Sequence, residues 1–208
     1  MAKIVGLSGS PRPEGNTDIL VKEALKAAAA LGLETEFVTL AGKDIQPCRA
    51  CYGCREEGAQ GKCAIDDDLP AIFERLKGAD GIIIGSPVYF LSVTAQLKAL
   101  FDRGLVLRYG KGRVKSRPGV RGGPEFLLTG KVGGAIAVAG SNGQQLTSLD
   151  ILKWMIFQNM LVVGNGVDVG TNVSARGKGE VLKDKTALFH ARSTGVRVAE
   201  TVKALQRQ

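Results

Sequence analysis

The stretch KIVGLSGSPRPEGNT, residues 3–17, decides the fold of this chain. Residues 3–7 form an apolar run typical of a buried strand, and a loop rich in glycine, serine and proline follows at residues 8–15. Asn16 is a favoured helix N-cap, and apolar residues then recur at helical spacing as far as Leu31. A strand, a short loop and a helix in this order predict the first βα unit of a parallel sheet.

The same alternation continues along the chain. Further strand patterns lie at residues 35–40, 81–85, 132–139 and 160–163, and helix patterns at residues 69–76, 94–103, 146–157 and 186–205. We therefore expect a single α/β domain over residues 1–208, with a doubly wound, five-stranded parallel sheet in a three-layer arrangement. Ligands of such sheets bind outside the carboxyl ends of the strands, which singles out the loops at 8–17, 86–90 and 139–145.

Composition narrows the function. The 208 residues are 44% hydrophobic and 23% charged, and the net charge is +8. No apolar run approaches the roughly 20 residues of a membrane span, and the N-terminus lacks a signal-peptide pattern, so we expect a cytoplasmic protein with no membrane contact. Aromatic residues make up only 5% of the chain and no nucleic-acid-binding motif is present. The positive charge therefore fits a phosphate-bearing cofactor or an acidic redox partner better than nucleic acid.

The first loop has the features of a phosphate site. It joins a buried strand to a helix N-terminus, where unpaired backbone N–H groups and the helix dipole favour an anion. Side-chain donors suited to a phosphate are Ser8, Ser10, Arg12, Asn16 and Thr17. An ordinary capped turn would need only Asn16 and one glycine. The loop matches neither G-x-x-x-x-G-K-[ST] nor G-x-G-x-x-G, which argues against a P-loop nucleotidase and a dinucleotide fold.

Two motifs together resemble the NADPH-dependent FMN reductase family, which has the flavodoxin-like fold. They are GSPR at 9–12 followed by GNT at 15–17, and GSPVYF at 85–90 followed by Leu97-Lys98 and the triplet FDR at 101–103. The resemblance implies an FMN-dependent oxidoreductase that works in electron transfer. It places Pro87, Val88, Tyr89 and Phe90 beside the flavin ring, and Ala139, Gly140 and Gly143 near the ring's polar edge.

All four cysteines lie in one loop, predicted at 46–66, with the spacing Cys48-x2-Cys51-x2-Cys54-x8-Cys63. The first three match the compact triplet that ligates four-iron clusters. Tetrahedral zinc and free or disulfide-bonded thiols are the alternatives. The block resembles that of the iron-sulfur flavoproteins, which implies a [4Fe-4S] cluster beside FMN. The acidic run at 66–68 fits the N-terminus of the following helix better than a cation site.

Two further features carry less information. The segment 104–130 is rich in basic residues, and it is either a solvated loop or a segment that reaches a neighbouring subunit's flavin or an acidic partner. His190 is the only histidine and lies on the last helix, so we interpret it as structural.

These observations favour an iron-sulfur flavoprotein that passes electrons between FMN, a [4Fe-4S] cluster and a ferredoxin-like carrier. The first alternative is a cluster-free NAD(P)H-dependent FMN or quinone reductase. A flavodoxin-like binding module without turnover is the second alternative. The resemblance also implies a homodimer or homotetramer.

Overall fold

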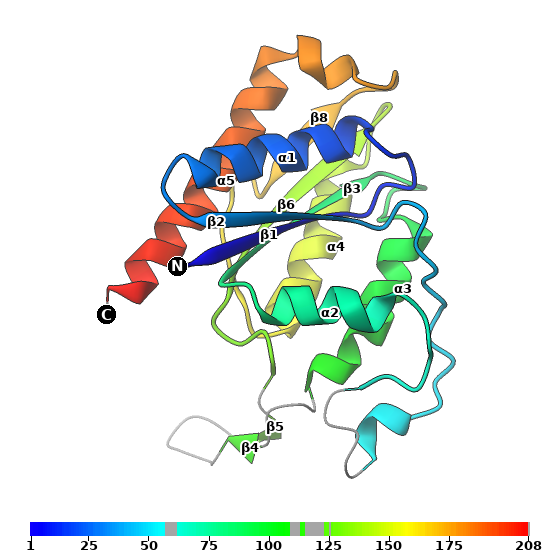
Figure 1. Cartoon of the computed structure of the whole chain (residues 1–208). Helices are drawn as coiled ribbons and strands as arrows, with labels where there is room; N and C mark the ends of the chain where they lie inside the picture. The colour runs from blue at the N-terminus through cyan, green and yellow to red at the C-terminus, as the bar shows by residue number, and fades with distance from the viewer. Residues whose placement is uncertain (57–61, 109–112, 115–122, 125, 208) are drawn as a thin grey trace.

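The computed structural model describes residues 1–56, 62–108, 113–114, 123–124 and 126–207 (Figure 1). Along the chain its elements are β1 (Lys3–Ser8), α1 (Asn16–Ala29), β2 (Glu34–Thr39), α2 (Leu69–Lys77), β3 (Gly81–Pro87), α3 (Ala95–Arg103), β4 (Arg113–Val114), β5 (Gly123–Pro124), β6 (Val132–Ala139), α4 (Gln144–Phe157), β7 (Leu161–Val162), β8 (Thr171–Ser174) and α5 (Lys185–Gln206). Short 3₁₀ turns add η1 (Gly53–Arg55), η2 (Gly104–Arg108) and η3 (Glu180–Lys183).

The main sheet has the order β2-β1-β3-β6-β7, and β8 also pairs with β6. Every pairing in it is parallel. Because β7 pairs with the start of β6 and β8 with its end, six strands fill the five predicted positions. The prediction of a doubly wound α/β fold with a parallel sheet between two layers of helices is confirmed. The predicted fifth strand at 160–163 is only partly right, since β7 has two residues and β8 completes the position.

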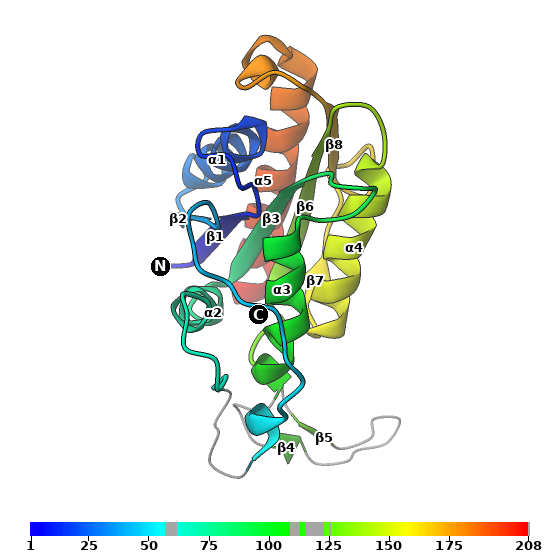
Figure 2. The same ribbon diagram turned by 90° about the vertical axis from the view of Figure 1, so that its right-hand side faces the viewer.

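Helices cover both faces of the sheet (Figures 1 and 2). On one face α1 and α5 form a core with Ile4, Ile83 and Ile136. On the other face α2, α3 and α4 form a second core that includes Ile82 and Ile84. Successive residues of β3 thus pack into the cores on opposite faces of the sheet, which explains why this strand is a continuous apolar run.

The order of strands reverses between β1 and β3, so the loops after these strands diverge. At this switch point, glycine residues let neighbouring segments of backbone approach each other closely. The backbone N–H of Gly9 donates to the carbonyl of Gly85 at 2.7 Å. A Cβ on Gly85 would lie 2.5 Å from Val21 of α1, closer than real Cβ contacts allow. The missing side chain lets the N-terminal half of α1 approach the sheet directly beside the switch point.

Three local predictions need correction or completion. Gly15, and not Asn16, is the N-cap of α1, and Asn16 is the first residue of the helix. The basic segment 104–130 begins with η2, and β4 and β5 form an antiparallel pair, but residues 109–112, 115–122 and 125 lie outside the described residues. Among the described residues, no helix is long and apolar enough to cross a bilayer.

Candidate functional site: a cationic cleft and a cysteine cavity

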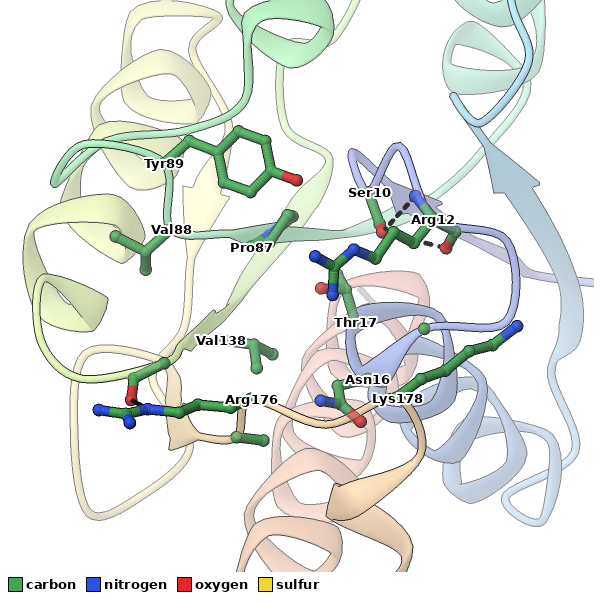
Figure 3. A pocket seen from close by; sticks show the side chains of 13 residues that line it. Ser10, Arg12, Asn16, Thr17, Pro87, Val88, Tyr89, Val138, Arg176 and Lys178 are labelled. Atoms are coloured by element: carbon green, nitrogen blue, oxygen red, sulfur yellow. Dashed lines mark hydrogen bonds between the residues drawn. The ribbon is translucent and has the colours of Figure 1, made fainter.

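An open pocket of about 260 Å³ lies at the carboxyl ends of β1, β3, β6 and β8 (Figure 3). Four segments that are distant in sequence line it. They are the loop after β1 with the start of α1 (Ser10, Arg12, Gly15, Asn16, Thr17), the loop after β3 (Pro87, Val88, Tyr89), the end of β6 (Val138, Gly140) and the loop after β8 (Ala175, Arg176, Lys178). The pocket is at the place where doubly wound sheets bind their ligands.

The loop after β1 is held in shape by Asp18, which is 2% exposed. Its carboxylate accepts from the Ser8 hydroxyl and, at 2.8 Å, from the backbone N–H of Glu14. Ser8 is fully buried, and its hydroxyl is used in this contact. Ser8 therefore stabilises the loop through Asp18. The prediction that its hydroxyl donates to a phosphate does not agree with this geometry.

Ser10 and Arg12 form the next turn of the loop. The Ser10 hydroxyl accepts from the backbone N–H of Arg12 and donates to the Arg12 carbonyl, each at 3.1 Å. Among the described residues no side chain caps the N-terminus of α1, whose first turn reaches the pocket through Asn16 and Thr17. The unpaired amides of a helix start, a hydroxyl and a guanidinium therefore meet in one place, as a phosphate requires.

The loop after β8 adds two cations that the sequence analysis missed, Arg176 and Lys178. Glu180 fixes the loop by accepting from the backbone N–H groups of Arg176 at 2.7 Å and Gly177 at 2.8 Å. The Asn16 amide donates to the Gly177 carbonyl at 2.8 Å, which ties this loop to α1. The sequence contains one signal for these cations, the basic run RGKG at 176–179. Its position at the end of a strand cannot be recognised from the sequence, because the four-residue β8 before it has no clear pattern.

Arg176 lies at the β6 side of the pocket, where its Nε donates to the Gly140 carbonyl at 2.6 Å (Figure 3). A Cβ on Gly140 would lie 3.2 Å from the Arg176 side chain. Lys178 lies near Asn16 on the other side (Figure 3). With Arg12, three cationic side chains surround the pocket, which gives it a strongly positive potential.

The loop after β3 turns sharply. Tyr89 and Ser92 exchange backbone hydrogen bonds at 2.9 and 3.2 Å, and the two residues between them have positive φ angles, 50° for Phe90 and 66° for Leu91. Positive φ angles are unfavourable for residues other than glycine, and they often occur in functional loops. Tyr89 lines the pocket, whereas Phe90 is fully exposed and is absent from its wall. The predicted ring contact of Phe90 therefore does not agree with the structure of this single chain.

The third predicted loop contributes only Gly140 of its three residues. Ala139 is 4% exposed, and its carbonyl accepts from Ala175 at 2.8 Å. Gly143 is the N-cap of α4 with φ +89°, and a Cβ there would lie 2.9 Å from Leu91. Gly143 therefore packs against the hairpin after β3 rather than against the pocket.

A second, smaller cavity of about 160 Å³ lies at the C-terminal end of α3, and all four cysteines line it. Cys48 and Cys51 are exposed, Cys54 and Cys63 are half-buried, and all four are free thiols. In the described part of the chain no three acidic, histidine or cysteine side chains are close enough together to hold a metal ion. The thiols thus share a cavity without forming a closed ligand set.

The pKa values of two of these thiols are shifted in opposite directions. A hydrogen bond from the Gly53 backbone, helped by the nearby Arg49, holds the pKa of Cys51 below its usual value. Burial raises the pKa of Cys54. Cys51 is therefore the more readily ionised of these two, and a thiolate is the form that binds metal.

The comparisons with known proteins agree with this geometry. A family model described as NADPH-dependent FMN reductase matches residues 2–174. The chain belongs to this family. An iron-sulfur flavoprotein of Methanocaldococcus jannaschii is 45% identical over 211 residues, which cover 99% of this chain and 100% of the relative. An iron-sulfur flavoprotein of Methanosarcina thermophila is 41% identical over 170 residues, covering 81% of this chain and 80% of the relative. A solved flavodoxin, WrbA-like protein from Agrobacterium tumefaciens has a TM-score of 0.63 at 18% identity, covering 98% of this chain and 99% of that one.

As a member of the NADPH-dependent FMN reductase family, the chain is a flavin-dependent oxidoreductase with FMN as its cofactor, and it exchanges electrons with a partner. The pocket fits FMN on independent grounds. It combines a helix N-terminus and three cations for a phosphate with an aromatic and aliphatic wall at Val88 and Tyr89 for a ring. Arg176 and Lys178 lie just beyond the part of the chain that the family model matches.

Proposed function

We propose that this chain passes electrons between FMN, a [4Fe-4S] cluster bound by its four cysteines, and a ferredoxin-like carrier. The observation that carries the proposal is the convergence of all four cysteines on one cavity. The printed names of its relatives, iron-sulfur flavoproteins that match over nearly the full chain, support the same assignment. Flavin exchanges electrons in pairs or singly, and an iron-sulfur cluster exchanges them singly, so a chain that holds both connects hydride donors to one-electron carriers.

In this proposal the cationic cleft holds FMN by its two ends. Arg12, Lys178 and the first amides of α1 bind the phosphate, since they combine positive charge with N–H donors. Val88 and Tyr89, which line the cleft, would cover the ring and exclude water from one side of it. Arg176, held by the Gly140 carbonyl, places a positive charge at the other end of the cleft, where it favours the reduced, more negative flavin.

The cysteine cavity suits a cluster in the number and kind of its donors. Four thiols border it, and Ile65, Leu105 and Val106 add apolar side chains to its wall, as expected of a site that limits the access of water to iron and sulfur. Ala50 and Tyr52 have left-handed backbone, with φ angles of 53° and 58°, so the chain turns sharply between the first three cysteines. Cys48, Cys51, Cys54 and Cys63 would be the ligands.

A cluster-free NAD(P)H-dependent FMN or quinone reductase is the second candidate. It is favoured by the exposure of Cys48 and Cys51 and by the open arrangement of the thiols. The description of the matching family names NADPH, which supports a nicotinamide donor in either case.

An absorption spectrum with iron and zinc assays on anaerobically purified protein separates these functions. We expect flavin bands, a broad shoulder near about 400 nm and four-iron stoichiometry. Cys54→Ala should lose the shoulder and the iron but keep the flavin. Ala64→Ser changes the same cavity without removing a thiol and serves as the control. Flavin without iron, with rapid bleaching by NADPH, would establish the cluster-free reductase instead, and zinc would make the cysteine loop structural.

We also infer that the chain assembles as a homodimer or homotetramer. On the outer face of α4 the residues Leu146, Leu149, Ile156 and Phe157 are all between 43% and 58% exposed. A surface helix that is apolar on both sides is typical of one covered by a partner. Light scattering of wild type and Leu149→Lys tests this, and an unchanged mass for the variant would contradict it.

A further inference from the structure

The cysteine loop is closed at its base by one side chain, Arg103. It is the last residue of α3 and is 2% exposed, which makes it the largest fully buried side chain among the described residues. Its guanidinium donates to the Gln46 carbonyl at 3.1 Å and to the Ile65 carbonyl at 3.4 Å. These carbonyls come two residues before the first cysteine and two residues after the last. The guanidinium therefore bridges the two stems of the loop.

Asp67 completes the closure. Its side chain is fully buried, and its carboxylate accepts hydrogen bonds from both terminal nitrogens of Arg103, one of them at 3.0 Å. The same carboxylate accepts from the backbone N–H of Gln46 at 2.9 Å and of Leu69 at 3.1 Å. Asp67 thus fixes the first stem of the loop to the start of α2, as the predicted helix N-terminal position of the acidic run requires.

Arg103 also faces the cysteines. It lines the cavity that the four thiols share. Its Nε–H is buried and has no hydrogen-bond partner among the described residues, while its other nitrogens are used. An unpaired buried donor is expensive, so one at a cavity wall points to an acceptor.

We propose that Arg103 is a positioning residue for the cysteine site: with Asp67 it holds both stems of the loop so that four thiols face one cavity, and its Nε–H donates to a ligand or cluster sulfur. This inference rests on the cluster proposed above. The guanidinium is planar and presents five donors in a fixed fork, so it can bind two carbonyls, a carboxylate and a sulfur at once. Neither lysine nor glutamine can replace that set.

Charge gives the proposal a signature that a purely structural role lacks. A positive group beside a cluster stabilises its reduced, more negative form and raises the reduction potential. Arg103→Gln leaves Asp67 uncompensated, and Asp67→Asn leaves Arg103 uncompensated. The two variants should therefore shift the cluster potential in opposite directions, downward for Arg103→Gln and upward for Asp67→Asn. Both should weaken retention of iron against a chelator by about 10–100-fold, the usual effect of losing a group that orients metal ligands.

The experiment compares wild type, both variants and Arg75→Gln, all purified anaerobically with FMN bound. Arg75 pairs with Glu36 on the surface and serves as a matched arginine–carboxylate control. Iron content, chelator resistance and cluster potential are measured, and the FMN content reports folding. Wild type without iron would overturn the proposed cluster and this inference with it. Iron in wild type with normal retention in both variants, or with potentials shifted in the same direction, would overturn the role of Arg103 alone. If Arg103→Gln lacks FMN and fails to fold, the Asp67→Asn potential decides, and a downward or absent shift refutes the proposal.

Discussion

Replacing Gly195 by alanine should destabilise the protein although it places a better helix former inside a helix. Gly195 lies in α5, where that helix crosses α1. A Cβ at this position would lie 2.0 Å from the Ala24 carbonyl oxygen and 2.7 Å from its carbon. Both atoms belong to the main chain of α1, so no side-chain rotation can make room, and the two helices must separate.

The expected size follows from two opposing effects. Alanine is favoured over glycine in a helix interior by about 1 kcal/mol. Overpacking typically costs about 1–3 kcal/mol, and this contact with backbone belongs at the upper end. The net loss is about 2 kcal/mol, which for a protein of this length lowers Tm by about 4–8 °C.

Thermal unfolding of the flavin-free protein, followed by circular dichroism, measures this loss without the added stability of bound FMN. Gly78→Ala is the control, because the φ of Gly78 is −77° and an added Cβ would lie 3.6 Å from the Glu74 carbonyl oxygen, an ordinary van der Waals contact. That variant should gain about 0.4–1 kcal/mol through a less flexible unfolded chain. A Gly195→Ala protein as stable as wild type would refute the close approach of α1 and α5.

Other predictions concern the cleft and the buried ion pair. Arg12→Met and Lys178→Met should each weaken FMN binding about 10–150-fold, because a hydrogen bond to a charged group contributes about 1.5–3 kcal/mol. Binding of riboflavin, which lacks the phosphate, should stay unchanged in the same fluorescence titration. Equal losses for both ligands would contradict a phosphate role. Tyr89→Ala should weaken FMN binding about 2–12-fold through lost ring contact, whereas Phe90→Ala should leave FMN binding unchanged. A larger loss for Phe90→Ala than for Tyr89→Ala would show that the exposed aromatic covers the flavin. Burial alone would raise the pKa of Asp67, but hydrogen bonds from the arginine partner and two backbone amides hold it below its usual value. Its ionised form is favoured in the folded state, so its stabilisation is complete above about pH 4 and is lost as pH falls through the lower folded pKa. Urea unfolding of wild type and Asp67→Asn between pH 7 and pH 3 should show less acid sensitivity in the variant, and parallel curves would rule this out.

The sequence predicts the fold well because its strands are unusually clear. Each central strand of this sheet is buried on both faces, so residues 81–85 and 132–139 stand out as unbroken apolar runs. The edge position lacks this signal. It is shared by β7 and β8, which have two and four residues, and no periodicity can be recognised over so few positions.

The candidate site is predicted only where chemistry and loop position coincide. Ser10, Arg12 and Tyr89 follow recognisable strands and line the pocket as expected. Arg176 was missed because it follows β8, and a basic residue after an unassigned segment resembles any solvated loop. Ser8 was assigned a ligand role since a hydroxyl beside a phosphate loop is a plausible donor, but only the tertiary contact with Asp18 reveals where that hydroxyl points.

The bond between the Asn16 amide and the Gly177 carbonyl joins groups 161 positions apart, and it has a consequence for biosynthesis. The first wall of the cleft emerges from the ribosome early, but the loop that completes the cleft is synthesised 161 residues later. A nascent chain therefore cannot complete the cleft until this loop has left the ribosome. Loading with FMN would thus act as a checkpoint that favours chains in which both walls are present.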